Sequence, residues 1–212
     1  MKKLIFTLMI LGMGISLASA QETKFGFTAG STLGQIRTNS ENGKQISDCL
    51  VGFSAGVVAD FPLGKTFSFQ PSLQFLQKGG SESASGGSDH IRLNYLDMPL
   101  NFIYRAPGTG GHFIAGIGPD LSLGLSGTET VKYNGISMSD KINFGSGDNE
   151  LKTLEFSGNI LAGYEWKGGF FLQANFNMGF NSLFNDSENP NSTEFWKNNY
   201  YGLRLGYFFG GK

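Results

Sequence analysis

The residues with the most obvious chemical capacity in this chain are the consecutive Ser88, Asp89 and His90. They are the three residue types of a hydrolase triad, in which each side chain is hydrogen-bonded to the next. Three consecutive side chains rarely meet in that way, so a solvated loop is the better interpretation. His112, the other histidine, opens a separate apolar segment. We therefore predict no catalytic residues, and we rank a lipid-modifying membrane enzyme last among the candidate functions.

Metal and cofactor sites are not indicated either. Two histidines and one cysteine give no ligand cluster for a transition metal. Asp140, Asp148 and Glu150 could bind Ca²⁺ loosely, but their spacing matches no calcium loop, and solvated loop charges explain them better. The Gly-Ile-Gly segment at 116–118 is followed by no helix start, so it is not a phosphate loop. The sequence thus predicts no metal and no cofactor.

The first 20 residues have the three parts of a secretory signal peptide. Lys2 and Lys3 precede an apolar run, and Ala18-Ser19-Ala20 supplies the small residues of a cleavage site. We expect residues 1–20 to be removed and residues 21–212 to form one domain. Cys49 is the single cysteine, so an intramolecular disulfide is excluded. It could be a reactive thiol or form an intermolecular link, but an inert cysteine is the better interpretation.

The composition of the chain argues against an ordinary water-exposed surface. Charged residues make up 16% of the sequence, below the ~25% of soluble domains, whereas glycine (32) and phenylalanine (20) are in excess. Without Lys2 and Lys3 the chain has 14 basic and 17 acidic residues, a net charge of −3. This balance gives no electrostatic reason to expect a nucleic-acid partner.

Eight segments alternate apolar and polar residues, which is the pattern of β-strands with one apolar face. In the fourth segment the apolar phase changes near Tyr95, which predicts a β-bulge with one extra residue there. Outside the signal peptide we find no convincing 3.6-residue period, so an all-β fold is expected. The segments are residues 24–36, 51–61, 66–78, 91–105, 112–125, 154–166, 169–184 and 200–209.

The connections between these segments alternate in length. Those at 62–65, 106–111 and 167–169 are tight and contain glycine, whereas those at 37–50, 79–90, 126–153 and 185–199 are long and polar. An up-and-down meander closed into a barrel would collect the long loops at one end and both termini at the other. The sequence therefore predicts an eight-stranded antiparallel up-and-down transmembrane β-barrel in the outer membrane.

The polar face of the strands carries mostly Gly, Ser, Thr, Asn and Gln, which suit the filled interior of an eight-stranded barrel. The phenylalanine-rich face would then meet lipid. A soluble, exported lipocalin-like barrel binding an apolar ligand requires the opposite orientation and is the main alternative. Two interfacial aromatic girdles are expected, one near the short turns (Phe61, Phe67, Tyr104, Phe113, Trp166, Phe170, Tyr207) and one near the long loops (Phe53, Phe75, Tyr95, Phe156, Phe184, Tyr200, Tyr201).

Four charged residues fall on the polar face of these strands: Asp97, Asp120, Glu155 and Arg204. Burying an unpaired charge costs several kcal/mol, so they should contact one another or a nearby amide. Arg204 can donate several hydrogen bonds and is the expected centre of this network. We interpret it as a structural plug rather than a catalytic site.

Three motifs in the middle of the chain resemble the PorT-like outer-membrane β-barrel family of Gram-negative bacteria. They are Gln77-Lys78-Gly79, Tyr95-Leu96-Asp97-Met98-Pro99-Leu100, and the segment from Phe113 to Asp120. The resemblance covers residues 67–124 by motif and the rest by layout. It implies a barrel in the outer membrane, and for one branch of the family a link to protein secretion.

The expected role is structural or surface-binding, through long extracellular loops on a side-chain-filled barrel. Long loops on a rigid scaffold commonly carry recognition, and residues 126–153 form the longest of them. The expected partners are outer-membrane lipid and an unidentified ligand or protein at the loops, and a monomer is favoured.

Overall fold

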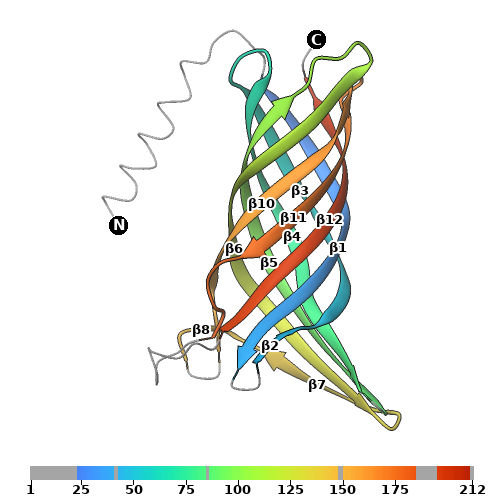
Figure 1. The fold of residues 1–212 in the computed structure, drawn as a ribbon, viewed down its shortest axis with the longest axis vertical. Coiled ribbons are helices and arrows are strands. Elements are labelled where there is room, and N and C mark those ends of the chain that lie inside the picture. The colour runs from blue at the N-terminus through green and yellow to red at the C-terminus, as the bar shows by residue number, and fades with distance from the viewer. Residues whose placement is uncertain (1–22, 41–42, 85, 148–149, 185–194, 211–212) are drawn as a thin grey trace.

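The computed structural model describes residues 23–40, 43–84, 86–147, 150–184 and 195–210. Residues 1–20 lie outside these ranges, so the signal peptide stays a sequence prediction. Eight long strands wind around a single barrel (Figure 1). They are β1 (Lys24–Ser40), β3 (Asp48–Pro62), β4 (Phe67–Ala84), β5 (Gly87–Arg105), β6 (Gly111–Tyr133), β10 (Leu154–Trp166), β11 (Phe170–Gly179) and β12 (Phe195–Phe209).

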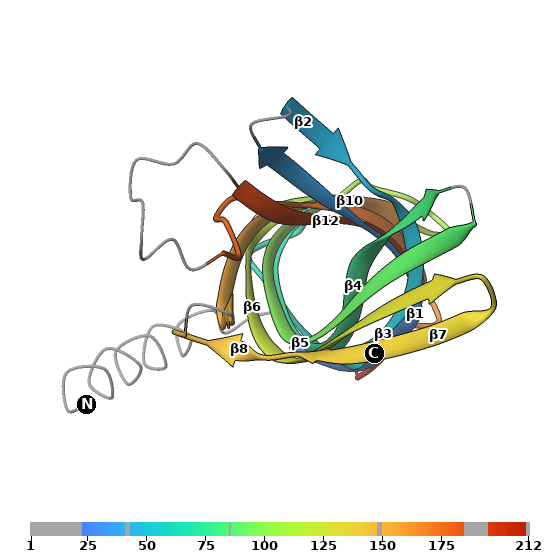
Figure 2. The same cartoon turned by 90° about the horizontal axis from the view of Figure 1, so that it is seen from below.

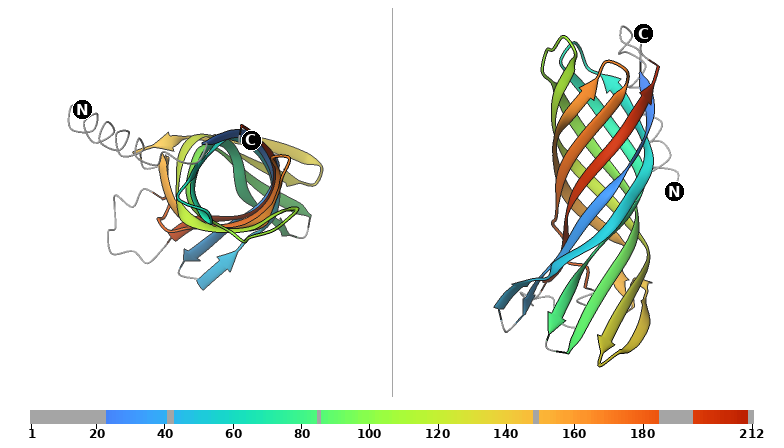
Figure 3. Two further views of the ribbon diagram at one scale, coloured as in Figure 1. Left: turned by 90° about the horizontal axis from the view of Figure 1, so that it is seen from above. Right: turned by 90° about the vertical axis from the view of Figure 1, so that its right-hand side faces the viewer.

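The barrel closes because its first and last strands pair with each other. β1 and β12 run antiparallel from the pair Phe25–Phe209 to the pair Asn39–Phe195. Each of the other strands pairs with its neighbours in sequence, and β6 pairs with β10 across the long insertion. The ring is visible when the molecule is viewed from either end (Figures 2 and 3). The predicted eight-stranded antiparallel barrel is confirmed.

No helix in the described ranges is long and apolar enough to cross a membrane.

The two ends of the barrel differ as the loop lengths predicted. Short turns join β3 to β4, β5 to β6 and β10 to β11 at one end (top of Figure 1), where Gly169 adopts a φ of 88° in the last of them. The opposite, long-loop end carries β2 (Gly43–Ile46), β7 (Ile136–Ile142), β8 (Phe144–Gly145) and β9 (Leu151–Lys152).

Several strands are longer than the sequence indicated, and all the large extensions lie at the long-loop end. β6 has 23 residues, against ~9–11 needed to cross a bilayer. It continues beyond the barrel wall with β5 and β7 as a projecting sheet (Figure 1). Both faces of these extensions are open to solvent, as the uninterrupted exposure of β7 before Ile142 shows.

The side chains divide between the two barrel faces as expected. The outward face is apolar, with Phe27, Ile117 and Leu203 all more than half exposed. The inward face of the middle of the barrel is polar, including Gln74, Asn159 and Asn177, which are almost fully buried. This arrangement is the reverse of a lipocalin-like barrel with an apolar interior, so that alternative is contradicted.

The predicted bulge near Tyr95 exists, but the extra residue is on the neighbouring strand. β5 stays in register with β4 along its paired length, so its phase does not change. The register of β5 with β6 shifts between Asn94 and Tyr95. Asn94 pairs with Ser126 and Tyr95 with Gly124, so Leu125 on β6 is the extra residue of the bulge. Ile91, Leu93 and Tyr95 therefore belong to the inward face together with Asp97.

Two aromatic residues expected in the lipid-facing girdles lie inside the barrel instead. Tyr95 and Tyr200 are 0% and 2% exposed, in an apolar cluster that closes the interior at the long-loop end. Phe171 and Phe208 pack inside with Val58 at the short-turn end. The polar interior is thus bounded by apolar layers, which the strict alternation of polar and apolar faces did not predict.

We expect a spin label at Phe176 to be more accessible to oxygen than to a water-soluble nickel chelate, because Phe176 lies on the apolar outer face. A label at Ser139, exposed on β7, should show the opposite preference. Both single-cysteine variants would be made in a Cys49→Ser background and reconstituted into vesicles. Preferential collision of the chelate with the label at Phe176 would contradict a lipid-facing outer wall.

Candidate functional site

The barrel interior holds a continuous chain of polar contacts around Asp97. The Arg204 guanidinium donates to Gln74 Oε1 over 3.0 Å, and Gln74 Nε2 donates to Asp97 Oδ2 over 2.8 Å. Asp97 Oδ1 accepts from the hydroxyl of Ser122. Asp120 accepts a 2.6 Å hydrogen bond from Asn177. All four predicted charged residues point inward, as expected.

Arg204 is not the centre of this network, contrary to the prediction. It reaches Asp97 through Gln74, and among the described residues it forms no ion pair with Asp97, Asp120 or Glu155. The central cation is Lys78 on β4 rather than Arg204 on β12, and the alternation had indicated Lys78 only as the last residue of its strand. The structure continues β4 beyond Lys78 to Ala84, which puts Lys78 inside the barrel.

Lys78 and Glu155 form a fully buried ion pair. Their side chains are 0% exposed and lie 2.8 Å apart. Lys78 Nζ also donates to Ser122 and lies 4.3 Å from the centroid of the Tyr95 ring, while Glu155 accepts from Asn198 over 3.0 Å. A buried pair of this kind needs additional hydrogen bonds to offset the loss of hydration, and it has them.

The glycine that follows Lys78 has a conformational role. Gly79 has a φ of 149°, and a Cβ there would overlap the carbonyl of Ile91 on β5. β4 also changes its register with β3 in this region. The Gln77-Lys78-Gly79 element therefore brings an interior cation into place and lets β4 pass close to β5.

A second charged cluster closes the interior at the short-turn end. Arg105 donates to Asp60 and to Glu165, each over 2.8 Å, and Lys24 pairs with Glu165 over 3.0 Å. Arg105 thus joins β3, β5 and β10 at the rim of the barrel.

The residues of the hypothetical triad lie on β5 rather than in a loop. Successive strand residues alternate between faces, so Asp89 lies on the face opposite to Ser88 and His90. The three side chains therefore cannot hydrogen-bond in sequence as a triad requires. His112 is at the other end of the barrel, where its Nδ1 lies 3.1 Å from the carbonyl oxygen of Ala106.

The acidic residues considered for calcium do not meet in one place that the structure describes. Asp140 pairs with Glu129 across β6 and β7, whereas Glu150 accepts from the backbone amide of Gly147. Asp148 lies outside the described residues. The described part of the chain contains no group of three or more His, Cys, Asp or Glu residues placed to hold a metal ion.

The projecting sheet ends in a hairpin with chemically different faces. Asn134 and Gly135 both have positive φ values, 49° and 82°, as the two-residue turn between β6 and β7 requires. Val131 pairs with Met138 and Tyr133 with Ile136, so these four apolar residues share one face, which we call the tip patch. They are 45–68% exposed. The Asn-Gly dipeptide is a sequence signal that could have revealed this hairpin.

The opposite face of the same hairpin is hydrophilic. The pairing places Thr130 beside Ser139, with their hydroxyls 3.0 Å apart, and Thr128 beside Lys141. Lys132 pairs with Ser137 in the same row. The hairpin therefore presents one surface that is apolar at its tip and acidic at Glu129 and Asp140, and one surface that is hydroxyl-rich and basic.

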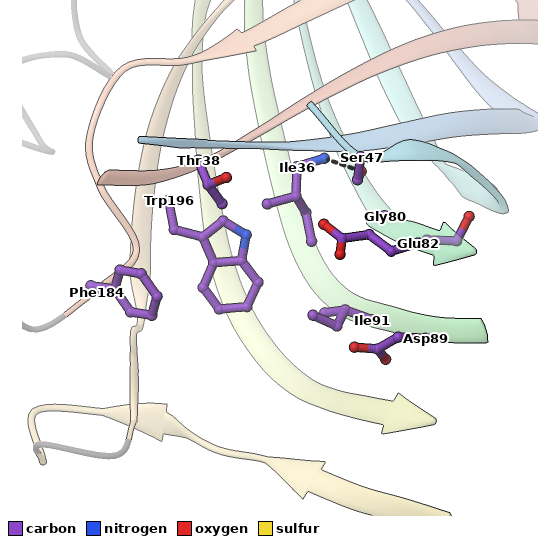
Figure 4. A pocket seen from close by; sticks show the side chains of 10 residues that line it. Ile36, Thr38, Ser47, Gly80, Glu82, Asp89, Ile91, Phe184 and Trp196 are labelled. Carbon is purple, nitrogen blue, oxygen red and sulfur yellow. Dashed lines mark hydrogen bonds between the residues drawn. The ribbon is translucent and has the colours of Figure 1, made fainter. Parts of the chain in front are cut away.

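A cavity of about 270 Å³ lies at the base of the projecting sheet (Figure 4). β4 and β5 form one wall, and β1 and the start of β12 form the other. Ile36, Ile91 and Trp196 supply apolar surface, and Glu82 and Asp89 supply carboxylates. The sequence analysis did not predict this cavity, because its lining comes from residues 36–91 and 184–196, which only the closure of the barrel brings together.

Residues 19–185 match the family described as outer membrane protein beta-barrel domain. The chain belongs to this family. Its location is accordingly the bacterial outer membrane, and the long-loop end with its projecting sheet is the extracellular end of such a barrel. No match was found among curated proteins.

Solved structures of outer-membrane proteins are similar to this chain at low sequence identity. Ail, the attachment invasion locus protein of Yersinia pestis, is 15% identical (TM-score 0.44), with 89% of this chain and 99% of Ail covered. Neisserial surface protein A is 12% identical (TM-score 0.47), with 89% and 100% covered. The N-terminal barrel of Pseudomonas aeruginosa OprF is 13% identical (TM-score 0.35), with 86% and 97% covered.

Replacing Lys78 with Met should destabilise this outer-membrane barrel by about 3–5 kcal/mol, because Glu155 would be left as an unpaired buried charge. The double variant Lys78→Met, Glu155→Gln should recover part of the loss, since both charges then leave together. Urea unfolding in lipid vesicles measures the difference, with Lys141→Met on the exposed hairpin as the control. An unchanged midpoint for Lys78→Met would contradict the buried ion pair.

Glu129, on the extracellular part of β6, provides a pH-dependent test. Partial burial and the nearby Asp89 and Asp140 carboxylates raise the pKa of Glu129 above its usual value. A raised folded-state pKa means that the hairpin is favoured when Glu129 is protonated and loses that stability as the pH rises.

Glu129→Gln should therefore slow amide hydrogen exchange in β6 and β7 by about twofold at neutral pH, by removing like-charge contacts across the strands. The difference should vanish below a pH of about 4, where the native carboxyl is also protonated. Faster exchange at neutral pH in the variant would show that Glu129 stabilises the hairpin instead.

Proposed function

We propose that this outer-membrane barrel is a surface-binding protein whose projecting hairpin engages a partner outside the cell. The observation that carries the proposal is the tip patch, which sets four large apolar side chains beyond the barrel wall. Contiguous exposed apolar surface at a loop tip is costly in water and is typical of interaction sites. Within the described residues, β7 pairs with β6 and with no other strand, so its outer edge is also open to main-chain pairing.

The filled interior supports a binding role over conduction. Eight strands enclose only enough space for side chains, and this interior is occupied by hydrogen-bonded polar residues between two apolar layers. The barrel then acts as a rigid platform, as in other proteins whose recognition elements stand on a stable scaffold.

We also propose that the chain belongs to the PorT-like branch of the outer-membrane barrels. Support comes from the positions of its three motifs, which lie on the adjacent strands β4, β5 and β6. Lys78, Tyr95, Asp97 and Asp120 from these motifs all point into the barrel. The motifs thus describe how the interior is packed, and a role in secretion does not follow from them.

For its partners, we propose lipid around the outer wall and a protein at the tip patch, with the barrel acting as a monomer. A single chain completes the ring by pairing β1 with β12, so a second copy is not needed to satisfy the strand edges.

A photo-crosslinking residue at Met138 should capture the partner on intact cells, and one at Ser139 should capture far less. The two positions are adjacent on β7 and differ only in the face of the hairpin that they occupy. Adducts at Met138 should decrease at least fivefold when Tyr133 and Ile136 are both changed to Ser. The reason is that losing these apolar contacts should weaken the binding free energy by roughly 1 kcal/mol or more.

Pull-downs comparing the intact chain with one lacking residues 132–147 provide a second readout. Partners recovered equally with and without this segment, together with equal crosslinking at Met138 and Ser139, would contradict binding by the tip patch.

A further inference from the structure

The cavity at the base of the projecting sheet combines features that point to a specific ligand chemistry. Its apolar surface comes from Ile36 and Ile91 and from the aromatic rings of Trp196 and Phe184, whose centroids are 5.1 Å apart. Glu82 and Asp89 project into it from neighbouring strands, where they form a cross-strand pair (Figure 4). Hydroxyl groups of Thr38, Ser47 and Ser81 complete the lining.

A buried polar atom at this cavity lacks a protein partner. Trp196 is 8% exposed, and its indole Nε1 has no hydrogen-bond acceptor among the described residues. The nitrogen edge of the ring is turned toward the cavity, on the side of Ile36 and the Glu82 carboxylate (Figure 4). Leaving a buried donor unsatisfied costs about 1–3 kcal/mol, so a ligand that supplies an acceptor would be favoured there.

The two carboxylates are also without a protein cation. The ion pairs found among the described residues involve Asp60, Glu155 and Glu165, and neither Glu82 nor Asp89 takes part in one. In addition, Asp89 Oδ1 is buried and has no hydrogen-bond donor within the described part of the chain. Two adjacent carboxylates with an open donor position attract a cation and repel phosphate, sulfate or carboxylate groups.

The geometry points to a binding site for a lysine or arginine side chain presented by a peptide segment. The cationic head lies between Glu82 and Asp89, and the methylene stem packs on Ile36, Ile91 and the Trp196 ring, as such stems do on apolar surface. A carbonyl of the bound peptide accepts from Trp196 Nε1. The cavity volume of about 270 Å³ equals that of roughly nine water molecules in the liquid. This volume fits one long side chain but not a lipid chain.

This site goes beyond the proposed binding by the hairpin. None of the residues that line the cavity belongs to β7 or to the tip patch. Removing the tip patch should therefore leave the cavity intact, and the two proposals can fail independently.

The chain has two tryptophans, so a Trp166→Phe background leaves Trp196 as the only one and makes its fluorescence report on the cavity. Purified, refolded barrel would be titrated with N-acetyl-lysine methylamide and N-acetyl-arginine methylamide. We expect saturable changes in Trp196 emission that weaken as salt is added. N-acetyl-norleucine methylamide, which has a similar stem and no charge, should bind at least about fivefold more weakly.

Glu82→Gln and Asp89→Asn should each weaken lysine binding by about fivefold, and the double variant should abolish the response. The matched control is Asp140→Asn, an acid on the same face of the extracellular sheet that does not line the cavity, and it should weaken lysine binding less than either cavity variant does. Heat-modifiable gel mobility checks that every variant is a folded barrel. The variant with Tyr133 and Ile136 both changed to Ser should keep its lysine affinity, whatever happens to the partner of the tip patch, because neither side chain lines the cavity.

Four results would each overturn the proposal. One is equal affinity for the lysine and norleucine probes, and another is unchanged lysine affinity in the folded Glu82→Gln, Asp89→Asn double variant. The third is the absence of any Trp196 response to the cationic probes. The fourth is a stronger response to a neutral sugar such as glucose, which would assign the cavity to saccharides.

Discussion

Closure of the sheet by β1 and β12 is the constraint on which the rest of the molecule depends. In hydrocarbon no water is present to bond an unpaired backbone group, so each strand must find partners on both of its edges. Fifteen residues of β1 pair with β12 while the other edge of β1 pairs with β3. Once the ring is closed, the outer wall can be wholly apolar, and the polar side chains of the same strands have only the interior to occupy.

The enclosed interior then determines which polar residues the chain can carry. It is too narrow for an aqueous core, so each buried group needs a protein partner. Short amides meet this need at the middle of the barrel, as in the contact of Asn159 with Asn101, whereas the buried hydroxyls of Thr28, Ser54 and Ser157 have no hydrogen-bond partner among the described residues. Lys78 and Glu155 meet as opposite charges, whereas Arg204 is linked to Asp97 through the Gln74 amide. Apolar clusters at both ends separate this network from water.

The sequence was sufficient to predict the part of the fold in which one face is apolar and the other polar. The bounds of the strand at residues 154–166 were predicted without error, and all eight barrel strands were found. Tyr95 and Tyr200 were assigned to the wrong face because an aromatic residue at a strand end is compatible with two environments. One is a lipid-facing girdle, and the other is an apolar layer inside the barrel. Alternation alone does not distinguish these environments.

The extracellular elements were harder to predict for a different reason. The hairpin of β6 and β7 is exposed on both faces, so the short alternation of its apolar residues does not mark a core-facing strand, and Asn134-Gly135 marks its turn. Lys78 was missed as an interior cation because its strand continues through Gly79 and Gly80 into Ser- and Glu-rich sequence typical of loops. The cavity at the base of the sheet depends on contacts between segments more than 100 residues apart, which no local pattern contains.

Pairing of the first strand with the last also affects how this protein is assembled. β1 and β12 are separated by most of the chain, and the interior contacts of Arg204 with Gln74 and of Asn198 with Glu155 join residues distant in sequence. Such non-local contacts form slowly, because the chain must first lose the conformational entropy of closing a long loop. Only then do the contacts contribute stabilising free energy. Synthesis must reach the final strand before the ring can close. Until that moment both terminal strands expose unpaired edges, so the polypeptide must be kept from aggregating until its C-terminal residues are in place.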